Sequence, residues 1–91
     1  MECIWTRHAE ERQQEWHRKL GVTREEVEEV LRRPEQIVEG DRGALIAQSR
    51  RSGELLRIPF LNGGKDRRIL TVYWTSRVSR YWKDRSHENT V

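Results

Sequence analysis

The hydrophobic pattern of this chain changes its period at Pro34, and that change decides what the chain can fold into. Before Pro34, apolar residues recur about every 3.6 positions, which is typical of helices that pack through one side. After Pro34, they alternate in short runs separated by glycine-containing turns, which is typical of strands. The sequence therefore predicts an α+β fold, with two N-terminal helices packed on a three- to five-stranded antiparallel sheet.

Local signals predict where the two helices begin and end. Thr6 can cap a first helix over residues 7–20, because its hydroxyl can accept a free N–H of the first turn. Gly21 favours an end to that helix, since glycine readily adopts the left-handed conformation found there. Thr23 and Glu26 match the capping box S/T-x-x-E, which predicts that a second helix begins there and continues to the proline.

The remainder of the chain divides into short strand-like segments. The predicted strands cover residues 36–39, 44–49, 55–61 and 68–75. Pro59 favours an edge position or a bulge, because proline donates no ladder hydrogen bond. Residues 3–6 can form a further strand or lead into the first helix, and residues 76–83 can form a short helix. We expect one domain over residues 1–85 and a frayed tail over residues 86–91.

Alternation sorts the side chains of the last two strands onto two faces. One face receives Leu56, Ile58 and Phe60, and the final strand places Ile69, Thr71, Tyr73 and Thr75 together on one side. Two helices can cover one face of so small a sheet. The other face is then half open and carries Arg57, Thr71, Tyr73 and Thr75, with Arg77 just beyond. Such a face can bind RNA, and the same pattern also fits an ordinary solvent-facing sheet.

Charge is unevenly distributed along the chain. Residues 1–41 hold 7 basic and 11 acidic side chains, whereas residues 42–91 hold 11 basic and 4 acidic ones. The first part therefore has a net charge of −4 and the second part +7, and 15 of the 18 basic residues are arginine. Arginine suits phosphate contacts because its planar fork matches phosphate oxygens. The same composition also suits the ion-pair networks of heat-stable proteins.

Several classes of function have no motif in this sequence. Cys3 is the only cysteine, so no internal disulfide forms and a cysteine-based metal site is not expected. Walker, HExxH, GxSxG and CxxC motifs are absent, and we expect neither a metal nor another cofactor. No apolar run follows Met1 as in a signal peptide, and none approaches membrane-spanning length. We therefore expect a cytoplasmic protein without membrane contact.

His8 and Arg12 are the first candidates for chemistry. Arg12 lies seven positions after Trp5, about two helical turns, and therefore falls on the apolar stripe of the first helix. His8 lies four residues before Arg12 and shares that side. Imidazole can transfer protons near neutral pH, and guanidinium can hold a phosphate. Arg12 can instead extend to solvent or pair with an acid. The purely structural alternative is a packed histidine beside Trp5 and an arginine bound to backbone carbonyls.

The run from Thr75 to Lys83 is a second candidate region, because it mixes hydroxyls, cations and aromatic rings. That mixture can bind single-stranded nucleic acid through base stacking and phosphate contacts. The same run can instead pack Tyr81 and Trp82 onto the core of the domain. The sequence leaves these two outcomes open.

Three stretches carry a resemblance to a known family. They are Arg7-His8-Ala9-x-x-Arg12, Gly21-Val22-Thr23-x-x-x-Val27-x-x-Val30-Leu31-x-x-Pro34 and Thr71-Val72-Tyr73-Trp74-Thr75-Ser76-Arg77. Over residues 6–83 the chain resembles the small DUF4258 family, which is similar in layout to RelE- and BrnT-like toxins. In those toxins two helices pack on an antiparallel sheet. The resemblance implies a RelE-like fold and a metal-independent endoribonuclease that acts on RNA and is partnered by an antitoxin protein.

The resemblance and the residues together give a hypothesis for each side chain. His8, Arg12 and Arg77 match the recurrent polar positions of the family. In the hypothesis, His8 is the acid or base, while Arg12, Arg57 and Arg77 hold the scissile phosphate. Tyr81 stacks a base or assists proton transfer. The RNA-binding surface consists of Arg57, Thr71, Tyr73, Thr75 and Lys83.

Two other hypotheses fit the same residues. A non-catalytic module that binds protein or nucleic acid would use the basic sheet without needing His8. A homo-oligomer would form if an exposed strand edge paired with a second copy of the chain.

Overall fold

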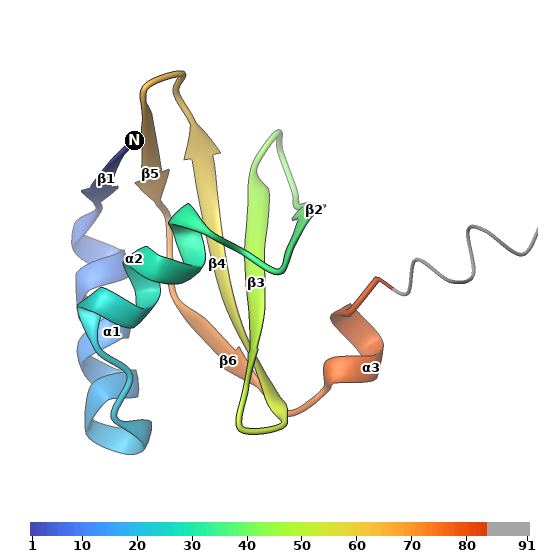
Figure 1. Cartoon of the computed structure of the whole chain (residues 1–91). Coiled ribbons are helices and arrows are strands. Elements are labelled where there is room, and N and C mark those ends of the chain that lie inside the picture. Colours follow the sequence, from blue (N-terminus) through green and yellow to red (C-terminus); the bar gives the residue numbers. More distant parts are fainter. Residues whose placement is uncertain (84–91) are drawn as a thin grey trace, which may run out of the picture.

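The computed structural model describes residues 1–83, and Figure 1 shows how their helices and strands are arranged. In chain order the elements are β1 (Glu2–Trp5), α1 (Arg7–Leu20), α2 (Arg24–Arg32), β2 (Gln36–Glu39), β3 (Leu45–Arg51), β4 (Glu54–Asn62), β5 (Asp66–Ile69), β6 (Tyr73–Thr75) and α3 (Val78–Tyr81). The prediction of an α+β fold is confirmed. The tail expected at 86–91, and residues 84–85 of the expected domain, lie outside the described residues.

The described residues form one mixed sheet of six strands, and this differs from the expected sheet. The strand order is β1-β5-β4-β3-β2, and β6 pairs with β4 off this path. β1 runs parallel to β5, with Ile4 opposite Arg68, while the other pairs are antiparallel. The expectation of three to five antiparallel strands is therefore corrected in strand number and in one direction. The four residues of β1 carry too little pattern to predict a pairing with a segment so distant in the chain.

The predicted helix ends are confirmed by the capping contacts. The hydroxyl of Thr6 accepts the N–H of Ala9 at 3.1 Å at the start of α1. α1 ends at Gly21, which has a left-handed φ of 73°. Thr23 and Glu26 form the complete capping box of α2. In Figure 1, α1 and α2 are grouped on the left of the central strands, and α3 stands apart on the right.

The hydrophobic core lies between the sheet and the pair α1 and α2. We call this side of the sheet the helix face. Its buried strand residues are Ala47, Leu56, Ile58, Phe60 and Ile69, and the helices add Ala9, Val27, Val30 and Leu31. Two tryptophans close the rim of the core: the indole N–H of Trp5 donates to the Glu28 carboxylate, and that of Trp16 donates to the Val72 carbonyl, both at 2.8 Å. Apolar burial on this face supplies most of the stability.

A break in the last strand changes which residues share a face. Ile69 lies opposite Phe60 and Tyr73 opposite Arg57, so four steps along β5 and β6 match three steps along β4. One extra residue is therefore inserted, which is a β-bulge. The expected continuous strand over 68–75 is wrong, and Ile69 belongs to the helix-side core rather than to the side of Tyr73.

Pro59 explains where the bulge falls. In antiparallel pairing, the N–H and the C=O of one residue point to the same neighbouring strand. The carbonyl of Pro59 accepts the N–H of Leu70 at 2.9 Å, so its missing N–H would have pointed towards the same segment. The hydrogen-bond ladder is interrupted at this point, so no carbonyl of the neighbouring strand is left facing the missing N–H of Pro59. Pro59 was expected either at a sheet edge or beside a bulge. The second outcome is observed, because β4 has neighbouring strands on both sides.

The opposite side of the sheet carries arginines and other polar side chains beside the fully buried Leu55, and we call it the arginine face. The register places Gln48, Arg50, Arg57, Tyr73 and Thr75 on it. α3 lies against this face, since the amide of Gln48 donates to the Tyr81 carbonyl at 3.1 Å. The sequence predicted this face to be half open, and the segment from Val78 to Lys83 covers part of it.

Within residues 1–83, no helix has the length and apolar character needed to cross a bilayer.

Candidate nucleic-acid interface

Arg57 occupies the centre of the arginine face. It sits on β4 between Gln48 on β3 and Tyr73 on β6. Its Nε donates to the side-chain oxygen of Gln48 at 3.0 Å, and its guanidinium lies 4.0 Å from the centroid of the Tyr81 ring. The rings of Tyr73 and Tyr81 meet edge to face, with centroids 6.3 Å apart. Four elements thus build one cation–aromatic cluster.

The turn after β6 explains how Tyr81 reaches this cluster. The hydroxyl of Thr75 accepts the N–H of Arg77 at 3.1 Å, which turns the chain at the end of the strand. A single turn of helix follows, and the N–H of Trp82 closes it by donating to the Val78 carbonyl at 2.8 Å. The chain is thereby folded back so that Tyr81 covers Arg57.

The charge of Arg57 lacks a carboxylate counter-ion among residues 1–83. The ion pairs of the described chain involve other arginines. Burial lowers the pKa of the Arg57 guanidinium from its usual value, and the neighbouring Tyr81 and Tyr73 raise that pKa in part. An arginine pKa is so high that the group stays protonated at neutral pH. A partly desolvated cation without a counter-ion favours the approach of an anion.

Further cations lie around Arg57. The guanidinium of Arg50 stacks 4.2 Å from the centroid of Trp82, and that of Arg80 lies 5.5 Å from the centroid of Tyr81. Exposed Arg77 and Lys83 lie at the two ends of the α3 segment. Two acids, Glu2 and Asp66, share this side of the sheet at its other end, on β1 and β5, and the Glu35 carboxylate accepts the main-chain N–H of Arg50 at 2.6 Å. Among the described residues near α3, the cations therefore outnumber the acids.

Two glutamines that belong to no sequence motif complete the cluster. Gln48 is fully buried and Gln36 is 7% exposed. The amide of Gln48 donates to the side-chain oxygen of Gln36 at 2.9 Å and to the Tyr81 carbonyl. Strand alternation in 44–49 would have placed Gln48 beside Arg57, but nothing in the sequence indicates that the chain end folds back to bury it.

The structure does not bring His8 and Arg12 to this cluster. Both belong to α1, which packs on the helix face, so the sheet separates them from Arg57 and Tyr81. His8 is exposed, and the inward side of α1 carries Ala9 and Gln13 instead. Arg12 lies beside that inward side.

The contacts of Arg12 match one of the expected alternatives, a pair with an acid. Its guanidinium pairs with Glu15 at 2.9 Å and lies 5.7 Å from the centroid of Trp16. Arg12 is thus held by a carboxylate and an aromatic ring on its own helix. The two halves of the predicted catalytic set lie on opposite sides of the sheet.

The remaining predicted residues divide between the cluster and its rim. Tyr73 is 37% exposed, whereas Thr75 is buried and its hydroxyl is used by the turn. Thr71 lies in the bulge, half-buried, outside any strand. Arg77 is exposed beside the turn. Lys83 is exposed at its side chain, and its main chain bonds to Gln36.

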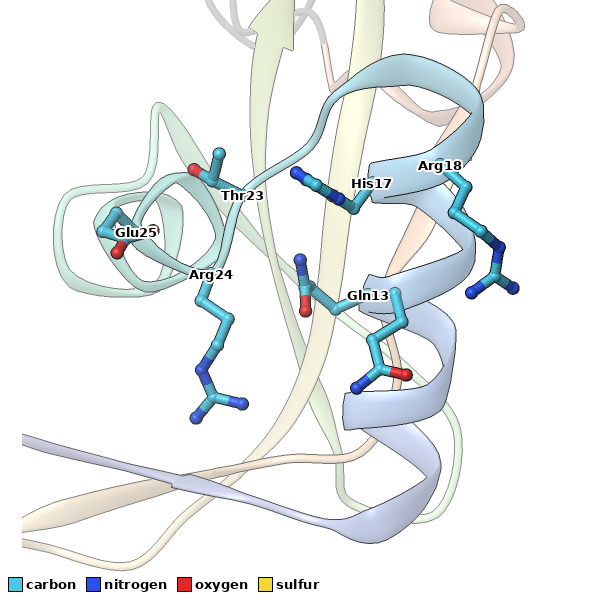
Figure 2. Close-up of a pocket in the computed structure, with 7 residues that line it drawn as sticks. Gln13, His17, Arg18, Thr23, Arg24 and Glu25 are labelled. Atoms are coloured by element: carbon cyan, nitrogen blue, oxygen red, sulfur yellow. The ribbon is translucent and has the colours of Figure 1, made fainter.

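A separate groove of about 370 Å³ lies between α1 and the start of α2 (Figure 2). Its walls are formed by Gln13, Gln14, His17, Arg18, Thr23, Arg24 and Glu25. Figure 2 shows His17 directed towards the start of α2, while Arg18 points away. The guanidinium of Arg24 pairs with the Glu10 carboxylate at 3.6 Å and lies 4.2 Å from the centroid of the Trp5 ring. The groove contains none of the predicted catalytic residues.

No group of histidine, cysteine and carboxylate side chains that could hold a metal ion occurs in the described part of the chain. Comparisons with family models, with curated proteins and with solved structures found no match to this chain. The fold and the site therefore define a small α+β protein with a basic, aromatic sheet face.

Proposed function

We propose that this protein binds single-stranded RNA across the arginine face. The observation that carries the proposal is the placement of Arg57: a half-buried cation against the Tyr81 ring, opposite Tyr73 in the β4–β6 pair, with no carboxylate partner among residues 1–83. Proteins that bind single strands combine aromatic rings, on which bases stack, with cations that contact the phosphates. Arg57 would hold a phosphate, and Tyr73 would offer its exposed ring to a base.

The sequence resemblance supports a more specific form of this proposal. A DUF4258-type protein, similar in layout to RelE- and BrnT-like toxins, would act in the cytoplasm and be held in check by an antitoxin protein. The packing of α1 and α2 on one face of a sheet agrees with that layout.

The test is RNA binding by matched arginine variants, measured as fluorescence anisotropy of labelled polyadenylate and polyuridylate. Arg57→Gln should weaken binding about tenfold, because a charge-assisted phosphate contact and a stacking partner are lost. Arg33→Gln makes the same charge change at the C-terminal cap of α2, where the side chain is 83% exposed, and should leave affinity unchanged.

A second variant protects this test from a folding defect. Arg80 is exposed and bonds to neither glutamine, so Arg80→Gln should fold normally and weaken binding by a smaller factor. If Arg33→Gln and Arg57→Gln lower RNA affinity equally, the binding depends on net charge alone and not on the arginine face. Absence of RNA binding by the wild type would overturn the proposal.

RNA cleavage at the same face is a second candidate function, and the contact between Arg57 and Tyr81 favours it. In metal-independent cleavage, the ribose 2′-oxygen attacks the adjacent phosphorus and the bond to the 5′-oxygen breaks. Arg57 would stabilise the charge that develops on the phosphate, and the Tyr81 hydroxyl would donate a proton to the leaving oxygen. The 2′-hydroxyl proton would pass to solvent, because His8 lies across the sheet.

Cleavage is tested by the integrity of total RNA after induced expression. Wild type and the His8→Ala/Arg12→Ala double variant should both degrade RNA and slow growth, whereas Tyr81→Phe should do neither. If only the double variant loses activity, the chemistry belongs to α1. If RNA stays intact in all three, the protein binds RNA without cutting it.

A further inference from the structure

The two buried glutamines of the arginine face are satisfied by the chain's own main chain. The side-chain oxygen of Gln36 accepts the N–H of Lys83 at 3.0 Å, and its amide donates to the carbonyl of the same residue. Gln48 donates to the Tyr81 carbonyl at 3.1 Å. One glutamine thus pairs with both polar groups of a single residue, as a neighbouring strand would.

The segment that makes these contacts lies on the same face as the fully buried Leu55, but its own residues are half-buried or exposed. None of the residues of α3, Val78–Tyr81, is buried. Tyr81 and Trp82 are half-buried and lie against guanidinium groups, 4.0 Å from Arg57 and 4.2 Å from Arg50. These polar and cation–π contacts exchange readily with water or another ligand, unlike the contacts of the helix-side core.

Buried amides are costly unless they have hydrogen-bond partners, so the glutamines need an occupant. A peptide unit offers an N–H beside a carbonyl oxygen. The edge of a nucleobase offers the same neighbouring donor and acceptor, which is why glutamine side chains pair with bases. The two kinds of occupant can therefore replace each other at Gln36 and Gln48 without leaving a buried polar group unpaired.

We propose that residues 78–83 form a displaceable cover over the RNA-binding face, and that single-stranded RNA replaces their main chain at Gln36 and Gln48. This inference rests on the proposed RNA binding. In the free protein the cover forms hydrogen bonds to both glutamines and shields one side of Arg57 from solvent. When RNA binds, base edges take the amide groups, and the basic cover swings aside on the turn at Thr75. Tyr81 then leaves Arg57, so this inference belongs to RNA binding and is incompatible with the Tyr81-dependent cleavage considered above.

Amide hydrogen exchange in the full chain tests the replacement directly. The N–H of Lys83 reports on the contact with Gln36, and the N–H of Leu70, bonded to the Pro59 carbonyl at 2.9 Å, is the matched control within the sheet. Saturating polyadenylate should speed exchange at Lys83 and leave Leu70 unchanged. Bound RNA with unchanged or slower exchange at Lys83 would overturn the inference while leaving RNA binding intact.

A variant that loosens the cover gives an independent measurement. Trp82→Ala removes the ring under Arg50 and leaves both glutamines in place, so it should raise RNA affinity several-fold. Leu20→Ala, which truncates a half-exposed apolar residue at the end of α1, is the control and should have no effect. Weaker binding by Trp82→Ala would show that Trp82 contacts RNA in place, against the inference. Absence of binding by both proteins would instead overturn the proposed function.

Discussion

On the helix side of the sheet, each ion pair of the described residues joins an arginine to a glutamate of α1 or α2. On the arginine face, Arg50, Arg57 and Arg80 stack on Trp82 or Tyr81 and form no carboxylate pair within residues 1–83. Most arginines of the helix side are thus paired with a carboxylate, although Arg67 there donates to the Leu31 carbonyl and lies over the Phe60 ring, whereas the three arginines of the other face rest on aromatic rings. Exposed ion pairs contribute little stability, whereas uncompensated arginines on aromatic rings suit an anionic ligand.

The two faces also differ in what holds them together. The helix face buries Leu56, Ile58 and Phe60 completely against the helices. The arginine face relies on a hydrogen-bond network through Gln36 and Gln48 to the chain near its C-terminal end. The comparison predicts that stability resides in the first face and ligand binding in the second.

The largest expected effect separates two neighbouring residues of β4 that point to opposite faces. Phe60→Ala should lower the free energy of unfolding by ~3–5 kcal/mol, because it leaves a cavity in the core. Leu61→Ala, at a position 40% exposed on the other side, should change it by less than ~1 kcal/mol. Urea unfolding followed by tryptophan fluorescence measures both. Similar losses at the two positions would contradict the division of roles.

A buried polar group gives the next effect. Gln48→Leu should cost ~1–3 kcal/mol of unfolding free energy, because Gln36 and the Nε of Arg57 each lose a partner. Gln14→Leu, the same change at an exposed position of α1, should lie within ~0.5 kcal/mol of wild type. Thermal and urea unfolding provide the measurement. A Gln48→Leu protein at least as stable as wild type would show that the network is not needed for folding.

A smaller effect compares the ends of two helices. Thr23→Ala should cost about 1 kcal/mol, since it removes the capping box of α2. α3 has no side-chain cap within the described chain, so Ser79→Ala should leave stability unchanged. Urea midpoints of the two variants, measured in parallel, test this contrast. Equal midpoints for Thr23→Ala and wild type would show that the capping box does not contribute to stability.

The smallest effect concerns the salt dependence of RNA binding. Each phosphate contact to a single strand contributes about 0.7 to the slope of log affinity against log salt. Arg57→Gln should reduce that slope by about this amount, whereas Arg12→Gln, paired with Glu15 on the helix side, should leave it unchanged. Anisotropy titrations at several salt concentrations give the slopes. If only Arg12→Gln reduces the slope, the RNA binds at α1 and not at the arginine face.

Features coded within a few neighbouring residues could be predicted from the sequence. Thr6 and Gly21 bound α1 as expected, and the capping box begins α2. Alternation correctly placed Arg57 and Tyr73 on the same face. These features depend on local conformational preferences and on the period of strands, which a single sequence displays directly.

Features that depend on contacts between distant segments could not be predicted. The bulge shifts the register by one residue and moves Ile69 to the core, and its cause lies in the neighbouring strand at Pro59. The spacing of His8 and Arg12 predicts that they share one side of α1. Whether that side faces the core or solvent depends on how α1 packs on the sheet. Burial of Gln48 depends on the chain folding back after β6, which no local pattern displays.

The most direct test of the account is a chemical-shift titration of the labelled full chain with polyadenylate RNA. Binding at the arginine face predicts that the largest amide shifts fall on Gln48, Arg57, Tyr73 and the cover over residues 78–83, with little change along α1. Shifts concentrated around His8 and Arg12, with the sheet unaffected, would contradict the account and return the site to the first helix.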